Sequence, residues 1–302
     1  MRRLLWLTAA AFLAAGCSQG PGREVAADVQ PDPRPLDGAL HFTAAEAAEL
    51  HRSEEQEIRQ CMNRRGFDYR VGPVGDVEGQ AAGSPYGLLT QRRASADGYG
   101  LTARRLRTPP ADPNTQQVSS LTVRERQAWE EALKGSPDGP REEIVLQDGP
   151  TLSVATDSCV SVGRRALYGA SWERDHYTVQ HLRNAIVKDT LGHRLVKAAE
   201  RKWAACMRDE GFRYEHREDP LKALKKRLDA AGSDAAALRA TGRDELKTAV
   251  RDAVCQAEAG LAGEISRAQK QVEKALPPAR TSRLEEFRAA RDSALRRAGE
   301  PA

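Results

Sequence analysis

Residues 61–70 are CMNRRGFDYR and residues 206–217 are CMRDEGFRYEHR, so the pattern Cys-Met-x-x-x-Gly-Phe-x-Tyr occurs twice in 302 residues. Each copy follows a stretch whose apolar residues have helical spacing. Gly66 and Gly211 stand where a left-handed residue would stop each helix, and the Phe and Tyr can then fold back onto it. We therefore expect each motif to end a helix and to serve packing: Cys as a staple, Met and Phe as core.

Helical signals recur along the rest of the chain. Thr43–Glu46, Thr122–Glu125 and Ser282–Glu285 have the spacing of capping boxes, and one long periodic stretch covers 243–276. We expect a mainly α fold of two related helical halves that arose by internal duplication. Each half would carry its own disulfide, and the first would include an irregular or short-hairpin segment near 86–102.

The four cysteines beyond the N-terminal region form an even set of widely spaced residues, which is typical of disulfides in an exported protein. Zinc sites use close pairs, and no two of these cysteines are near neighbours. The repeat favours Cys61–Cys159 and Cys206–Cys255, because each half would keep its own bond. The alternative that would clamp the halves together, 61 to 206 with 159 to 255, stays open at this point.

The N-terminus carries export signals. A basic MRR is followed by the apolar LLWLTAAAFLA, which is too short for a stable membrane span, and then by LAAGC ending at Cys17. This ending resembles the lipobox of bacterial lipoproteins, which implies lipidation of Cys17 and cleavage just before it. We expect a signal peptide at 1–16, a disordered Pro/Gly-rich tether at 17–40, and helical halves at 41–170 and 171–302. General secretion is favoured over twin-arginine export.

Several segments together resemble one group of exported proteins and lipoproteins of actinobacteria. They occur in the order CMNRRGFDY, YGLLTQRRASADGYGL, LTVRERQAWEEALKG, DSCVSVGRRALYG and KAAERKWAACMRDEGFRY, between about residue 50 and about residue 260. That group has no assigned biochemical activity. The resemblance therefore implies a host range and a fold only, whereas the expected location, lipid-anchored on the extracytoplasmic face of the cell membrane, follows from the lipobox.

Net charge and composition limit the classes of partner that this protein is expected to bind. The formal net charge is +4, or +2 (4 − 2) without Arg2 and Arg3 of the expected signal peptide, and charged residues are interspersed. This pattern lacks the basic stripe of a nucleic-acid binder, so no nucleic-acid partner is expected. The expected partners are the membrane, through the lipid anchor, and an envelope protein or cell-wall component.

The candidates for chemistry are few. Tyr86 and Tyr99 flank a glycine-rich segment and could form a binding loop that stacks on a sugar or peptide, although packing of both rings on the helices is favoured. His176 and His181 are five residues apart, a spacing that does not suit a helical metal site, and no cofactor or metal is expected. No nucleophile elbow or phosphate-binding loop occurs.

Two function classes stay open. The first is a non-enzymatic binding or interaction protein of the cell envelope, which the anchor, tether and helical halves favour. The second is a cell-envelope hydrolase with a site assembled from dispersed acidic residues, none of which the sequence singles out. A solute receptor is a weaker third, because alternating strand–helix units are absent.

Overall fold

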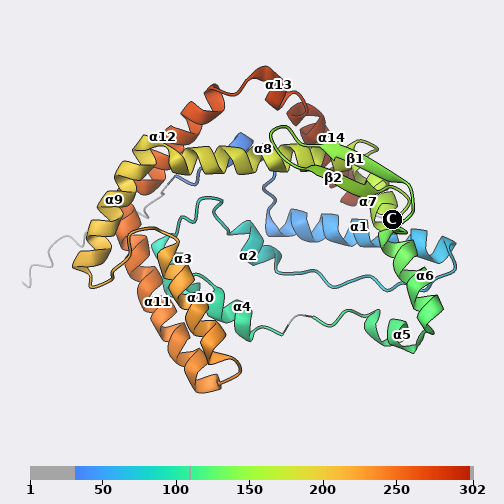
Figure 1. The fold of residues 1–302 in the computed structure, drawn as a ribbon, viewed down its shortest axis with the longest axis horizontal. Helices are drawn as coiled ribbons and strands as arrows, with labels where there is room; N and C mark the ends of the chain where they lie inside the picture. Colours follow the sequence, from blue (N-terminus) through green and yellow to red (C-terminus); the bar gives the residue numbers. More distant parts are fainter. Residues whose placement is uncertain (1–30, 109, 300–302) are drawn as a thin grey trace, which may run out of the picture.

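The computed structural model describes residues 31–108 and 110–299, so the expected signal peptide and Cys17 lie outside the described residues. The chain is mainly helical (Figure 1). Its first part forms η1 (Pro35–Gly38), α1 (Ala44–Arg64), α2 (Val77–Ala81), α3 (Gln91–Asp97), α4 (Leu101–Leu106), α5 (Thr115–Ser120), α6 (Val123–Lys134), β1 (Arg141–Val145), β2 (Thr151–Ala155) and α7 (Cys159–Tyr168). Its second part forms α8 (Trp172–Gly192), α9 (Arg194–Asp209), α10 (Asp219–Ala231), α11 (Ala235–Glu258), α12 (Leu261–Lys274), α13 (Pro278–Thr281) and α14 (Leu284–Ala298).

The two repeated motifs end α1 and α9 in the same way. Gly66 and Gly211 have φ of +82° and +87°. The amide of Phe67 donates to the carbonyl of Met62 over 3.0 Å, and the corresponding bond at the end of α9 measures 2.8 Å. With the bond from each glycine amide to the carbonyl three residues back, these are two Schellman endings, as the sequence predicts.

The disulfides are Cys61–Cys159 and Cys206–Cys255, with Cα separations of 5.4 and 5.6 Å, so the pairing within halves is confirmed and the clamp between halves is wrong. Each bond joins a motif helix to an antiparallel partner. The partners differ, because Cys159 begins α7 whereas Cys255 lies near the end of α11. The structural similarity between the two copies of the motif therefore covers the helix endings. Duplication of a whole half stays a prediction.

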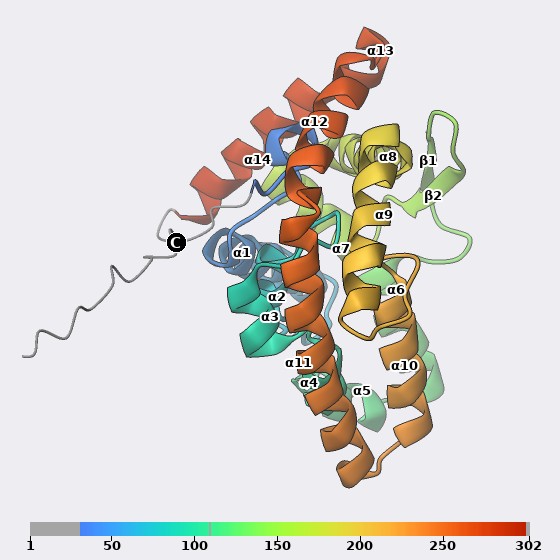
Figure 2. The same cartoon turned by 90° about the vertical axis from the view of Figure 1, so that its left-hand side faces the viewer.

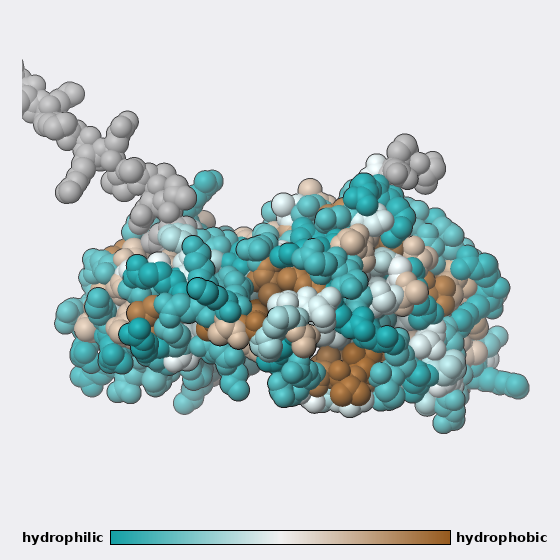
Figure 3. Space-filling model, turned by 90° about the horizontal axis from the view of Figure 1, so that it is seen from above, coloured by the Kyte–Doolittle hydropathy of each residue, from teal (hydrophilic) through white to brown (hydrophobic). Residues whose placement is uncertain are grey.

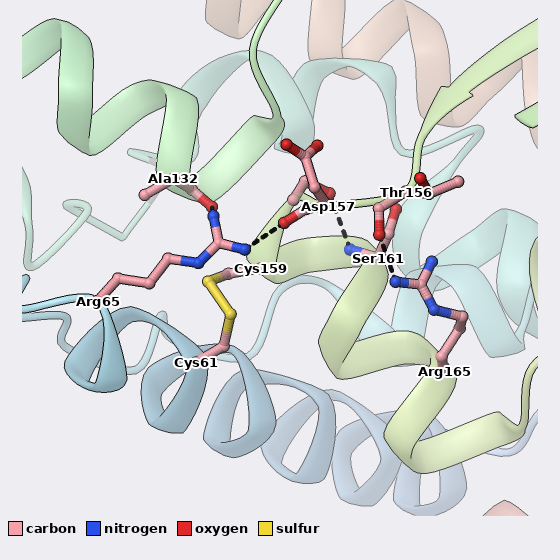
Figure 4. The surroundings of a disulfide bond; sticks show 9 residues. Cys61, Arg65, Ala132, Thr156, Asp157, Cys159, Ser161 and Arg165 are labelled. Atoms are coloured by element: carbon pink, nitrogen blue, oxygen red, sulfur yellow. Dashed lines mark hydrogen bonds between the residues drawn. A yellow bond between two sulfur atoms is a disulfide. The ribbon is translucent and has the colours of Figure 1, made fainter. Parts of the chain in front are cut away.

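An arginine supports the first disulfide (Figure 4). From the end of α1, the guanidinium of Arg65 donates to the carbonyl of Ala132 on α6, over 3.4 Å, and to that of Asp157 before α7. Ser158 caps α7. One side chain thus ties together the ends of three helices around the Cys61–Cys159 bond.

Segments of each sequence half pack against helices of the other half. The last helix, α14, packs on α1 and α7 of the first half as well as on α8, and α3 and α4 of the first half pack on α11 of the second. Figures 1 and 2 show α3 and α4 beside α11, with α2 farther away, toward α1. A core around Trp172 and Phe287, whose rings stack at 5.1 Å, joins helices from both halves. The boundary near residue 170 therefore does not separate two packing units.

Three sequence-based expectations about elements are wrong. The long helix expected over 243–276 is broken at Gly260, whose φ of +63° turns α11 into α12. The first half does contain a short hairpin, β1–β2, in register Arg141 opposite Ala155, but it does not lie at 86–102, where the chain forms α3 and α4. Ser282 does not cap α14, because its hydroxyl donates to the carbonyl of Ala279.

The end of the expected tether is ordered. Leu36 is 6% exposed and Ala39 is 2% exposed, within the core of α8 and α14. The amide of Leu36 donates to Glu273 over 2.7 Å. The disordered tether therefore cannot extend to residue 40, since burial of these apolar side chains fixes the backbone beside the prolines.

Candidate functional site

The two tyrosines of the candidate binding loop are not exposed. Tyr86 is 2% exposed, and its hydroxyl donates to Gln269 Oε1 over 2.9 Å. Burial raises the pKa of Tyr86 to about 12. Tyr99 is half-buried and donates its hydroxyl to Asp252 over 2.7 Å. The rings pack on helices, so an exposed stacking pair is wrong as a site.

Asp252 on α11 is the centre of a buried hydrogen-bond network. It is 2% exposed and accepts hydrogen bonds from Tyr99, from Trp203 Nε1 at 2.7 Å and from Gln256 Nε2 at 2.9 Å. Burial raises the pKa of its carboxyl, and the donors, Tyr99 foremost, oppose that shift. The hydrogen bonds offset the free-energy cost of burying this carboxyl. They also tie α9 and the 86–102 segment to α11.

Two further side chains of α11 hold the same segment by its backbone. Gln256 accepts a hydrogen bond from the amide of Leu89 over 3.0 Å. Glu245, 2% exposed, accepts from the amides of Leu101 and Thr102, each over 2.7 Å, at the start of α4. A side-chain acceptor that receives two amides there satisfies donors at the start of α4 that have no partner within the helix. The short helices α3 and α4 are thereby fixed on a long one.

These short helices line a groove of about 650 Å³. It runs between α2 on one side and α3 and α4 on the other. We call it the α2–α4 groove. Its floor is apolar, with Leu88 and Leu89. Its charged lining consists of Arg92, Arg93, Arg104, Arg107, Asp32, Asp76, Glu78 and Asp97.

Ionic and hydrogen-bond contacts cross the groove. Arg107 Nη1 lies 2.8 Å from Asp76 Oδ2, and the guanidinium of Arg93 donates to the carbonyl of Ala82. The hydrogen bond from Arg107, and next that from the amide of Gly79, holds the pKa of Asp76 below its usual value. A carboxyl of lowered pKa stays ionised at neutral pH, so Asp76 suits ion pairing rather than proton donation.

The histidines and acids within residues 31–108 and 110–299 are the candidate metal ligands. The described part of the chain contains no group of three or more His, Cys, Asp or Glu side chains arranged to hold a metal ion. His181 Nε2 lies 2.9 Å from the carbonyl of Gln147 at the hairpin tip. His176 is partly buried, and burial lowers its pKa, with the charge of Arg164 a smaller cause. None of the helices in residues 31–108 and 110–299 has the length and hydropathy needed to cross a membrane.

Exposed apolar side chains are scattered. Val123 is 81% exposed on α6, Val145 76% on β1 and Leu106 56% on α4, three separate elements. On the face in Figure 3, hydrophilic residues surround small apolar patches. The exposed surface therefore offers charged groups, more than apolar area, to a partner.

Sequence reasoning missed the buried acids of α11. Glu245, Asp252 and Gln256 recur at intervals of seven and four on the face that also carries Ala249 and Ala253. Polar residues that interrupt an otherwise apolar helical face are the signal that could have found them, since a buried polar group needs partners from elsewhere.

No protein-family model matches this chain, and neither a curated protein nor a solved structure matches it.

Proposed function

We propose that this protein is an exported lipoprotein, held on the extracytoplasmic face of the cell membrane, that binds a component of the cell envelope through the α2–α4 groove. We infer that it belongs to the group of actinobacterial exported proteins that its sequence resembles. The observation that carries the binding role is the groove itself: a 650 Å³ hollow with charged walls, mounted on α11 by buried hydrogen bonds.

The anchor rests on the sequence LAAGC, in which small residues directly precede Cys17. Two acyl chains on such a cysteine would hold a protein stably at a bilayer, whereas one chain would not. Two disulfides agree with an oxidising compartment outside the cytoplasm.

The groove has the character of a binding site for a charged ligand. Arginine guanidinium groups present planar donors suited to carboxylate and phosphate. The carboxylates opposite, of which Asp76 stays ionised beside Arg107, could receive amines. Ligands that carry both signs, such as peptides with free carboxylates and amines, match these walls better than uncharged sugars do.

The anchor is tested by labelling cells with a fatty-acid probe and fractionating them, with Cys17→Ala as the comparison. Label and membrane association that depend on Cys17 support the proposal. Wild-type protein that is unlabelled and free in the medium would show that the anchor is wrong.

The groove is tested by chemical crosslinking in intact cells, followed by mass spectrometry of the captured partners. Arg92→Glu with Arg104→Glu should lose the specific partner. Arg59→Glu with Arg124→Glu, exposed arginines on α1 and α6 outside the groove lining, has the same change in charge and should keep it. Equal capture by both variants would contradict the groove as the site.

A further inference from the structure

The described chain begins at the edge of the α2–α4 groove. Pro31 and Asp32 are part of the groove lining. Arg34 fastens this segment, because its guanidinium donates to the carbonyl of Gly83 over 2.7 Å and pairs with Asp32 at 2.7 Å. The segment that leads to Cys17 therefore leaves the folded body beside the groove.

The distance along the chain between the anchor and the groove is short. Cys17 and Pro31 are 14 residues apart (31 − 17). Fully extended, 14 residues span at most about 50 Å, and a flexible coil of that length averages about 20 Å between its ends. With Cys17 in the bilayer, the edge of the groove stays close to the lipid headgroups.

The α3–α4 side of this groove carries concentrated positive charge. Segment 91–107, which forms α3 and α4, contains five arginines and one acid, Asp97, for a net charge of +4 (5 − 1). The whole 302-residue chain also has a net charge of +4. Arg92 and Arg104 are exposed and line the groove, and within the described residues neither is in an ion pair.

The lining acids outside segment 91–107 are Asp32, Asp76 and Glu78, three charges that offset only part of its +4. Asp76 is paired with Arg107, and Asp32 is paired with Arg34. The guanidinium of Arg93 donates to a backbone carbonyl, which leaves its charge uncompensated by that contact. The α3–α4 side of the groove thus keeps an excess of positive charge toward solvent.

We propose that the arginines of α3 and α4 rest on the anionic surface of the membrane in which the protein is anchored, so that the groove opens at the level of the headgroups. The proposal rests on lipidation of Cys17 for its geometry. Electrostatic attraction of each basic side chain near an anionic bilayer raises binding by roughly five-fold, so a few arginines suffice to orient a protein that is already tethered. The envelope component bound in the groove would then be one presented close to the bilayer.

The test measures docking without the anchor. Full-length chain carrying Cys17→Ala is mixed with vesicles of phosphatidylglycerol and phosphatidylcholine, or of phosphatidylcholine alone, and bound protein is measured by co-sedimentation at low and high salt. We expect binding that needs phosphatidylglycerol and weakens with salt. Arg92→Ala with Arg104→Ala should reduce that binding by about 25-fold.

The control is Arg59→Ala with Arg124→Ala, which removes the same charge from α1 and α6 and should leave binding unchanged. Equal losses in both variants would mean a non-specific charge effect and would overturn the proposal. So would binding that ignores phosphatidylglycerol, or no binding at low salt. Circular dichroism of each variant shows that the helices are intact.

The two proposals fail in different ways. Wild-type protein that takes up no fatty-acid label at Cys17 overturns the anchor, and with it the reason for this orientation. Labelled wild-type protein whose Cys17→Ala form ignores anionic vesicles overturns the docking surface alone and leaves the anchored binding protein standing.

Discussion

Gly163 on α7 lies against Ile58 on α1 so closely that a Cβ atom at residue 163 would be 3.0 Å from Ile58 Cγ1 and 3.2 Å from the Ile58 backbone nitrogen. The approach occurs one turn from the Cys61–Cys159 disulfide, at which the two helices run antiparallel. Glycine suits this position because one of the two opposing atoms is backbone and cannot rotate away. The same contact places Ile58, 3% exposed, in the core beside the disulfide.

Gly163→Ala should therefore destabilise the protein although alanine favours a helix. Overpacking costs about 1–3 kcal/mol, against a gain of about 1 kcal/mol in helix propensity. Gly263→Ala is the matched control, since Gly263 lies within α12 and a Cβ there meets nothing within 4 Å. The propensity gain is common to both variants, so urea unfolding should place the Gly163 variant about 1–3 kcal/mol below the control. Equal stabilities of the two variants would mean that α1 and α7 can move apart to accommodate the added methyl group, and would contradict the prediction.

Asp252→Ala should loosen the segment that forms the groove. It leaves the indole of Trp203 and the hydroxyl of Tyr99 without their acceptor, and unpaired buried groups cost about 1–3 kcal/mol each. The Asp252→Ala protein should be less stable in urea, and trypsin should cleave it sooner after Arg92 or Arg93. Asp209→Ala, at an exposed position near the end of α9, should change neither measurement. Unchanged cleavage in the Asp252 variant would contradict the role of the network.

Tyr86 should make the protein sensitive to alkali. Its pKa is about 12 in the folded protein and about 10 in the unfolded chain, so the unfolded state loses the proton first. The stability contributed by the neutral phenol is complete below pH 10 and is lost as the pH rises toward 12, by about 2 kcal/mol. Tyr86→Phe should show a shallower fall in unfolding free energy over that window, even though it loses the Gln269 bond at every pH. Identical slopes for the wild type and Tyr86→Phe would refute the assignment.

The two disulfides should differ in their susceptibility to reduction. Cys61 is 4% exposed and Cys159 0%, whereas Cys206 is half-buried and lines a surface hollow with Lys202 and Glu258. A small reductant can reach the Cys206 sulfur without unfolding. Limited reduction, alkylation and tryptic digestion should label WAACMR and DAVCQAEAGLAGEISR before QCMNR.

Once both bonds are reduced, stability should fall. Chain-entropy estimates for loops of 98 and 49 residues give roughly 4–5 kcal/mol per bond. Labelling of QCMNR first, or of all three peptides together, would contradict the order of reduction.

The helical class and the ends of its main elements could be predicted from local sequence. Capping boxes at Thr43 and Thr122 and the glycine stops at Gly66 and Gly211 act within one or two turns, so the residues that decide them are adjacent in the chain. The disulfide partners could be inferred from the repeat, because two similar halves would each keep their own bond.

Where a local signal competed with packing, the sequence prediction was wrong. Ser282 lies in a capping-box spacing, but its hydroxyl bonds to the preceding turn of α13. The Pro- and Gly-rich stretch before residue 41 contains Leu36 and Ala39, which are buried because α8 and α14 cover them.

The sequence by itself determined a helical, disulfide-bonded chain with two equivalent helix endings, since those features depend on neighbouring residues and on cysteine pairing. Only the tertiary structure decided that α14 packs on α1, that α3 and α4 pack on α11, and that Asp252 accepts from Tyr99 and Trp203. These contacts join residues far apart in the chain, and their free energy comes from burial and from satisfying buried polar groups. Local propensity carries no information about them, and the groove, which is built from them, could not be read from the sequence.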